Sequence, residues 1–159
     1  MHGPERTLDP RVVTLWRVQR IVRTATVGIA VAVGLGFAAR SVGGATAGVA
    51  VGVGWVMFQL VMAVVWPALE FRNFRFAVRE HDLLVQSGVL FRRWSVIPLG
   101  RIQHLDTRQG LIERTLGLVR LHVYTAAGMS ADGTIPGLDR QVAEALRDEL
   151  AQRGGDDGV

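Results

Sequence analysis

The sequence predicts a membrane α-helical hairpin followed by an α+β, mainly-β domain, in which an antiparallel sheet is closed by one C-terminal helix. Three observations lead to this fold class. Residues 24–39 and 41–69 contain no charge, apolar residues alternate with period two after Phe74, and the chain ends in an amphipathic helical pattern. Because charged residues recur every few positions from Glu70 onwards, the domain boundary is predicted there.

The balance of charge also separates the two parts. Residues 1–69 carry six arginines against two acids, whereas residues 70–159 carry twelve arginines against twelve acids. A nucleic-acid-binding surface needs concentrated positive charge, so the neutral second part argues against that class. No cysteine is present, which excludes disulfides, thiolate nucleophiles and Cys-ligated metals.

Two apolar runs predict transmembrane helices at about 21–39 and 45–66. A helix needs about 20 apolar residues to cross the hydrocarbon core, and each run supplies roughly that number. The second helix is expected to end at Trp66-Pro67. Before the first run, Asp9-Pro10 is typical of a helix start and predicts a short interfacial helix, with a disordered arginine-rich tail as the alternative.

Arginines flank the hairpin unequally. Only Arg40 lies in the predicted turn, whereas the other flanking arginines precede the first run or follow the second. They are Arg11, Arg17, Arg20 and Arg23 on one side and Arg72, Arg75 and Arg79 on the other. By the positive-inside rule, both termini are predicted to be cytoplasmic.

Small residues recur at helical spacing within both runs. The glycines concerned are Gly28 and Gly36 in the first run and Gly44, Gly48 and Gly52 in the second. Such faces let helix backbones approach closely in lipid, so we expect them to pack the two helices together, with homo-oligomerisation as the alternative. The uncharged run centres argue against transport, and a small pore would require several copies assembled around Gln59.

The second part of the chain reads as a meander of short strands. A first strand begins at Phe74, and further strands are expected at 83–86, 89–97, 102–107, 119–124 and about 129–135. Asp139 is the predicted N-cap of a final helix that Gly154-Gly155 ends. The domain is therefore bounded at 70–153, and residues 154–159 are predicted to form a disordered tail.

A set of motifs makes this pattern specific. The motifs are Ile97-Pro98-Leu99-Gly100-Arg101-Ile102-Gln103-His104-Leu105-Asp106, Gln109-Gly110, Glu113-Arg114-Thr115-Leu116-Gly117-Leu118 and Val123-Tyr124-Thr125-Ala126-Ala127-Gly128. Together with the two apolar runs, they resemble the bacterial pleckstrin-homology-like (PH-like) family of YdbS-like membrane proteins, over nearly the whole chain. The resemblance implies a curved sheet capped by a C-terminal helix, a location in the bacterial cytoplasmic membrane, and a binding or assembly module without catalysis. It implies no residue-level binding site.

No residue pattern predicts catalysis, a cofactor or a metal site. His104 and Asp106 share a strand face, and His122 joins them if their strands pair, a set that could bind a metal. Exposed strands commonly carry such residues without a ligand. Ser95 with His104 and Asp106 lacks the nucleophile turn of a serine hydrolase, so an enzyme acting at the membrane is the weaker hypothesis.

The favoured function is a membrane-anchored scaffold that assembles with itself or with another PH-like membrane protein at the cytoplasmic face. The partner contact is predicted within residues 103–118, because this segment combines an unpaired strand edge with the apolar insertion Leu111-Ile112. The alternative is that Leu111 and Ile112 plug the open end of the sheet. The contact residues are Gln103, Arg108, Leu111, Ile112, Glu113 and Arg114. A lipid headgroup-binding module acting through Arg92 and Arg93 is the alternative function, and these arginines could equally form a solvated strand edge.

Overall fold

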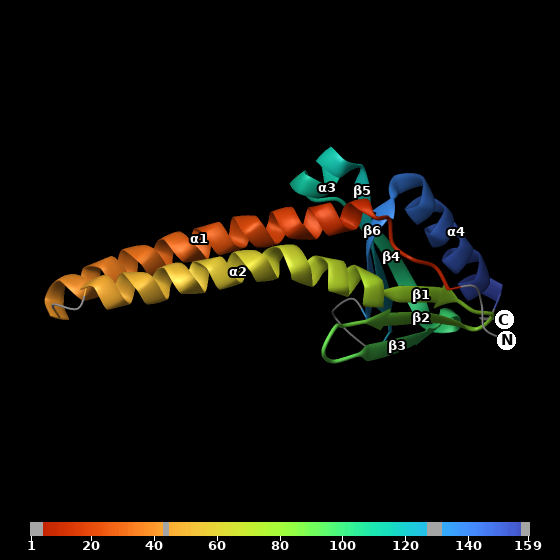
Figure 1. The fold of residues 1–159 in the computed structure, drawn as a ribbon. Coiled ribbons are helices and arrows are strands. Elements are labelled where there is room, and N and C mark those ends of the chain that lie inside the picture. Colours follow the sequence, from red (N-terminus) through yellow and green to blue (C-terminus); the bar gives the residue numbers. More distant parts are fainter. Residues whose placement is uncertain (1–4, 43–44, 127–131, 157–159) are drawn as a thin grey trace. The chain divides into compact units, whose positions relative to one another are not determined.

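A computed structural model describes residues 5–42, 45–126 and 132–156 of the chain. The chain divides into two compact units, shown as a ribbon in Figure 1. One unit is the helical pair Trp16–Ala68, and the other combines Met1–Leu15 with Leu69–Val159. The second unit is referred to below as the β domain.

The helical unit consists of most of α1 (Arg11–Val42) and most of α2 (Ala45–Asn73), which lie side by side (Figure 1). The helices are antiparallel, because Arg17 Nε donates to the carbonyl oxygen of Val64 over 3.2 Å while Gly28, further along α1, faces Val56. The prediction that the second helix ends at Trp66-Pro67 is wrong, since α2 continues through Pro67 to Asn73. Proline removes one main-chain donor but does not end this helix.

One helical segment among the described residues, Ala50–Asn73, is long and apolar enough to cross a membrane. Only 11% of an 18-residue apolar stretch within it is buried in the protein, and large apolar side chains such as Val51 are mostly exposed. In the core of a soluble protein, the apolar side chains of such a helix would be buried. The segment is therefore a candidate membrane span.

The β domain contains two antiparallel three-stranded sheets. The first has the order β1 (Arg75–Val78), β2 (Asp82–Ser87) and β3 (Arg93–Pro98), and the second has the order β4 (Ile102–Arg108), β5 (Leu118–Thr125) and β6 (Gly133–Asp139). The 3-10 turn η1 (Leu99–Arg101) links the sheets, and α3 (Leu111–Leu116) connects β4 to β5. The C-terminal helix α4 (Arg140–Asp156) packs on the second sheet. The predicted mainly-β architecture with a C-terminal helix is confirmed.

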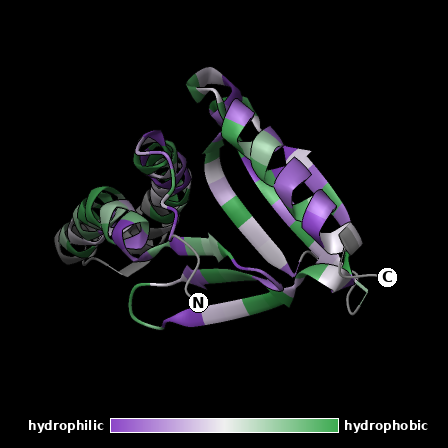
Figure 2. Ribbon diagram, turned by 90° about the vertical axis from the view of Figure 1, so that its right-hand side faces the viewer, coloured by the Kyte–Doolittle hydropathy of each residue, from purple (hydrophilic) through white to green (hydrophobic). Residues whose placement is uncertain are grey.

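The core forms because apolar residues fall on one face of each element. In β5, Leu121 and Val123 are fully buried while His122 between them is half-buried, as the period of two requires. Helix α4 contributes Ala143, Leu146 and Leu150, which are buried at helical spacing. Its alternating apolar and polar residues are visible in Figure 2.

The two ends of the β domain differ from the prediction. Helix α4 does not stop at Gly154-Gly155 but reaches Asp156, because its packing against η1 outweighs the cost of about 1 kcal/mol that a glycine imposes on a helix. Residues 154–156 are thus helical, and residues 157–159 of the predicted tail lie outside the described residues. The last strand begins at Gly133, whereas residues 129–131 of its predicted range lie outside them as well.

The N-terminal segment packs in the β domain. Arg6 forms an antiparallel bridge with Phe76 of β1, and Leu8, Val12 and Leu15 are buried. Helix α1 begins directly after Asp9-Pro10, as the sequence predicts, but its first turns cover protein and do not form a separate interfacial helix. The difference arises because Leu8, Val12 and Leu15 are buried, with Val12 lying against Gly137 of β6.

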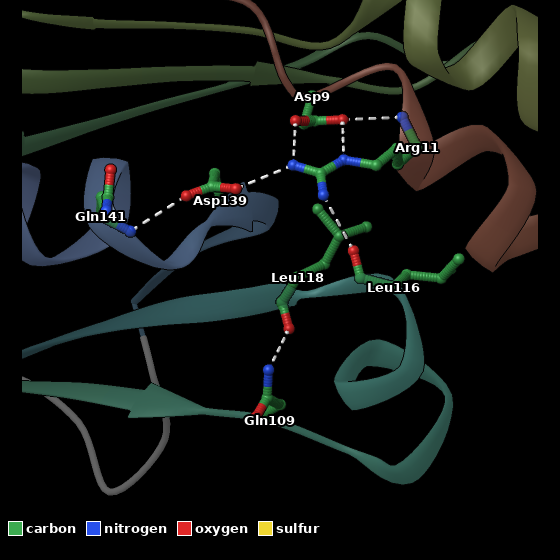
Figure 3. A network of polar contacts seen from close by, with 7 residues as sticks. All are labelled: Asp9, Arg11, Gln109, Leu116, Leu118, Asp139 and Gln141. Carbon is green, nitrogen blue, oxygen red and sulfur yellow. Dashed lines mark hydrogen bonds and ion pairs between the residues drawn. The ribbon is translucent and has the colours of Figure 1, made fainter.

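Arg11 holds this segment in place through a network that Figure 3 shows. Its guanidinium donates to Asp9 Oδ2 over 2.8 Å, to Asp139 Oδ2 over 2.8 Å and to the carbonyl oxygen of Leu116 over 3.1 Å. Asp139 also accepts a hydrogen bond of 3.1 Å from the main-chain N–H of Gln141, which confirms the predicted N-cap of α4. The start of α1, the end of α3 and the start of α4 therefore share one cation.

This network predicts a defined response to acid. Hydrogen bonding to the Arg11 guanidinium is the main cause that lowers the pKa of Asp139 and of Asp9 below the usual value. A carboxyl group whose pKa is lower in the folded state adds stability above its unfolded pKa of about 4 and loses that contribution as the pH falls below it.

Asp139→Asn keeps an acceptor for the helix cap but loses the ion pair. We expect the variant to unfold at a lower temperature than the wild type at neutral pH, with a difference that shrinks below about pH 4.

Thermal unfolding of both proteins across this pH range measures the effect. Glu144→Gln serves as the control, because its carboxylate makes an exposed pair with Arg140 on the surface of α4. A difference between wild type and Asp139→Asn that stays constant from neutral pH to about pH 3 would contradict the role of the ion pair.

Candidate functional site

An open groove of about 410 Å³ lies between β4 and α4. We call it the edge groove, and its lining residues are Ile102, Gln103, His104, Leu105, Arg147, Leu150, Ala151, Gly154 and Gly155. In the described part of the chain, β4 pairs with β5 alone. The groove therefore follows the outer edge of the second sheet.

The wall that β4 provides has a specific geometry. It is made of the four consecutive residues 102–105, whereas successive side chains of a strand point to opposite faces of the sheet. A wall of consecutive residues is expected where a groove runs along the main-chain edge of a strand. The pairing with β5 also shifts between Ile102 and His104, which leaves Gln103 outside the regular ladder. Such an edge offers N–H and C=O groups to an added strand.

The side chains of the edge groove combine an apolar base with a basic rim. Leu150 is fully buried, and Ile102 and Leu105 are half-buried. Arg147 and His104 are exposed, and no acidic residue is among the described residues that line the groove. Arg147 makes an exposed ion pair with the adjacent Asp148 at 2.8 Å, which an incoming carboxylate could replace at little cost.

The structure separates the predicted partner-contact residues into two places. Gln103 lines the edge groove, whereas Arg108 lies at the opposite end of β4, roughly 17 Å away at the usual rise per strand residue. Arg108 donates to Asp106 over 2.6 Å and to the Tyr124 hydroxyl over 3.3 Å. On α3, Leu111 is 86% exposed, Arg114 is exposed and Ile112 is half-buried.

Glu113 cannot contribute to the edge groove or to the exposed surface of α3, because its side chain is buried. It accepts hydrogen bonds from Arg120 Nε and from the main-chain N–H of Gly110, the latter over 2.6 Å. The carboxylate thus caps the start of α3 and neutralises Arg120. Its inclusion in the partner contact was wrong for a local reason, since Glu three residues after a helix N-cap commonly folds back onto it.

The polar residues considered for a metal or a catalytic site have structural partners. Strand pairing sets Asp106 opposite His122 and His104 opposite Tyr124. Burial is the main cause that lowers the pKa of His122, whose Nδ1 lies 3.0 Å from Thr134 Oγ1. The hydrogen bond from Arg108 lowers the pKa of Asp106. Within the described residues, no group of three or more His, Asp or Glu side chains is placed to hold a metal ion.

Of the predicted helix-packing glycines, Gly28 has a described neighbour across the helix pair. A Cβ added to Gly28 would lie 3.4 Å from Val56 Cγ2, whereas one added to Gly34 would meet nothing within 4 Å. Gly52 is half-buried. The surroundings of Gly36, Gly44 and Gly48 lie outside the described residues. Arg92 and Arg93, the predicted headgroup contacts, are exposed where β2 connects to β3.

Gly28 and Gly34 provide a matched test of close helix packing. Gly28→Leu should lower the stability of the helical unit by about 1–3 kcal/mol, because the side chain would force α1 away from Val56. Gly34→Leu places the same side chain in open space and should change the stability of the helical unit little. Thermal unfolding in mild detergent compares them, and equal stability of the two variants would exclude a tight contact at Gly28.

Two antiparallel sheets closed by a C-terminal helix, preceded in the chain by an exposed apolar helix, define a PH-like domain attached to a candidate membrane span. The family model described as the bacterial PH domain matches residues 30–154. The chain belongs to this family, and the resemblance seen in the sequence is confirmed.

The chain is also similar in sequence to two members of a family of transmembrane proteins. The chain is 30% identical to the UPF0699 transmembrane protein YdbS of Bacillus subtilis (strain 168) over 155 residues, which are 94% of this chain and 92% of the relative. It is 23% identical to the UPF0699 transmembrane protein YdbT of the same organism over 105 residues, which are 65% of this chain and 21% of that relative. No solved structure matches the chain.

Proposed function

We propose that the chain is a membrane-anchored, non-catalytic assembly module whose edge groove binds an extended segment of another membrane protein. The observation that carries the proposal is the open groove along the unpaired edge of β4. Main-chain hydrogen bonds to an edge strand provide affinity, while alternate side chains of the added segment enter neighbouring pockets and provide specificity.

The lining of the groove defines the segment that fits it. The half-buried Ile102 and Leu105 suit an apolar side chain, and Arg147 suits a carboxylate on a neighbouring position of the segment. The exposed bulge at Gln103 leaves main-chain groups without a regular ladder partner on β5. A short extended peptide with apolar and acidic residues therefore matches the site in shape and charge.

A membrane anchor favours this kind of weak contact. When both partners are confined to one membrane surface, their effective concentration rises and a modest interface is sufficient. One organism holds both a relative of this chain's length and a longer relative of which the match covers 21%. Coexistence of such proteins supports a PH-like membrane protein, or a second copy of the chain, as the partner.

The proposal includes a topology in which α1 and α2 both cross the cytoplasmic membrane and both termini are cytoplasmic. The arginine asymmetry supports it. Because the chain has no cysteine, single cysteines can be introduced without background. An impermeant thiol reagent added to intact cells should label Ser41→Cys and not Thr107→Cys, and the opposite labelling pattern would invert the topology.

A side chain that fills the edge groove tests the assembly function. Ala151 is exposed and lines the groove, whereas Ala145 is exposed on the same helix outside it. Ala151→Trp should abolish co-purification of the partner from native membranes, and Ala145→Trp should leave it unchanged. Equal recovery of the partner with the two variants would reject the groove as the binding site. Thermal unfolding of both variants verifies that the β domain is intact.

A further inference from the structure

A second surface of the β domain carries large apolar side chains in full contact with solvent. Leu90 is 75% exposed and Phe91 is 89% exposed in the connection between β2 and β3, and Trp94 of β3 is 58% exposed. We call residues 88–94 the tip loop. Val96 continues the apolar surface along β3, because it lies two residues after Trp94 on the same face and is 56% exposed.

The chemistry of the tip loop is that of a membrane interface. Arg92 and Arg93 separate Phe91 from Trp94, and both arginines are exposed. From Leu83 to Leu105 the chain contains three arginines and no acidic residue. Apolar side chains beside arginine and tryptophan match the boundary between acyl chains and phosphate groups. A protein partner would have to supply matching acidic and apolar groups, whereas an anionic bilayer offers both along its whole surface.

The turn that begins the tip loop requires a glycine. Gly88 has a φ of +104°, and a Cβ at this position would lie 1.9 Å from the carbonyl oxygen of Phe91. Only glycine fits such a turn without rearrangement. The turn therefore presents Leu90 and Phe91 to solvent instead of letting them fold back onto the sheet.

Strand register places the tip loop near the point where the chain leaves the candidate membrane span. That span ends at Asn73 and β1 begins at Arg75. Arg75 pairs with Gln86 of β2, and Gln86 pairs with Trp94 of β3. The tip loop therefore lies at the same end of the first sheet as the start of β1. It is about 10 Å from β1, which is two strand spacings.

We propose that the tip loop inserts into the anionic leaflet of the membrane that holds the span, with Leu90, Phe91 and Trp94 among the upper acyl chains and Arg92 and Arg93 on the phosphates. The bound surface is a phospholipid bilayer, and the contact is independent of the edge groove. Insertion fixes one face of the β domain against the membrane and so limits how its other surfaces meet a partner.

The test uses the full chain in vesicles of phosphatidylglycerol and phosphatidylcholine. An environment-sensitive fluorophore is attached at Leu90→Cys, or at Val142→Cys as the matched control, because Val142 is an apolar residue of α4 that is 50% exposed. The label at position 90 should be quenched by lipids that carry a quencher in the acyl chain, at a depth of roughly 5–10 Å, and protected from aqueous iodide. The label at position 142 should show the reverse.

Two variants carrying the Leu90→Cys label separate the apolar and the basic contributions. Phe91→Ser should reduce quenching by the lipid probe at least about twofold, because it removes the most exposed inserting side chain. Arg92→Gln with Arg93→Gln should abolish the difference between vesicles with phosphatidylglycerol and vesicles of phosphatidylcholine alone. Neither variant alters a buried residue, so thermal unfolding should be unchanged.

Two results would overturn the proposal. Free access of iodide to the label at position 90, equal to that at position 142, would show that the tip loop stays in water. Protection from iodide without any quenching from lipid would show that a protein, either a second copy or another partner, covers the loop instead of the bilayer.

Discussion

Gly137→Ala should lower the free energy of unfolding of the β domain by about 2–4 kcal/mol. Gly137 has a φ of +62°, and a Cβ at this position would lie 2.2 Å from Val12 Cγ2. The substitution therefore adds backbone strain and also pushes the N-terminal segment away from β6. Thermal unfolding of the purified full chain, followed by circular dichroism, measures the loss.

Two further glycines separate these contributions. Gly117 has a similar φ of +68°, but the nearest atom to its added Cβ is Arg11 Nη1 at 3.5 Å, and Gly155 has nothing within 4 Å. Gly117→Ala should show the strain alone, about 1–2 kcal/mol, and Gly155→Ala should not destabilise. If Gly137→Ala is no more harmful than Gly117→Ala, Val12 does not pack on β6 as the structure describes.

Glu113→Ala is the second substitution with a large expected effect, a loss of about 3 kcal/mol. The change leaves the Gly110 N–H and the Arg120 guanidinium without the buried carboxylate that both groups bind. Because α3 connects β4 to β5, its loosening should also disturb the end of the second sheet. Glu113→Gln retains one acceptor and should lose less.

Chemical denaturation of each variant measures this effect, with Glu144→Ala as the control. Glu144 is half-exposed in its ion pair with Arg140, so its removal should cost less than about 0.5 kcal/mol. Similar stabilities of Glu113→Ala and Glu144→Ala would contradict a buried role for Glu113.

Local patterns were sufficient to predict most elements of the β domain. Alternation around Phe76 and Val78 and around Leu121 and Val123 marks strands whose inner face is buried, and Asp139 marks the start of the last helix. Element ends were predicted less well, because Pro67 and Gly154 impose only local costs that helix packing outweighs. Helix α3 was missed because its six residues are too few to show a helical period.

The start of the chain and the candidate site show where sequence reasoning reaches its limit. Leu8, Val12 and Leu15 are buried in the structure, but the surface that covers Val12 includes Gly137, more than a hundred residues later. The edge groove likewise combines β4 with the end of α4. The sequence pointed to Gln103 and to an exposed edge, but the contribution of Leu150 and Ala151 depends on tertiary packing.

Photo-crosslinking in native membranes tests the central claim most directly. A photoreactive amino acid is placed at Gln103 and at Ala151, on opposite walls of the edge groove, and at Ala145 as the control on α4. The account predicts adducts from both groove positions that map to the same short segment of one membrane protein or of a second copy of the chain, and none from position 145. Only lipid adducts in the groove, or equal protein adducts at all three positions, would contradict it.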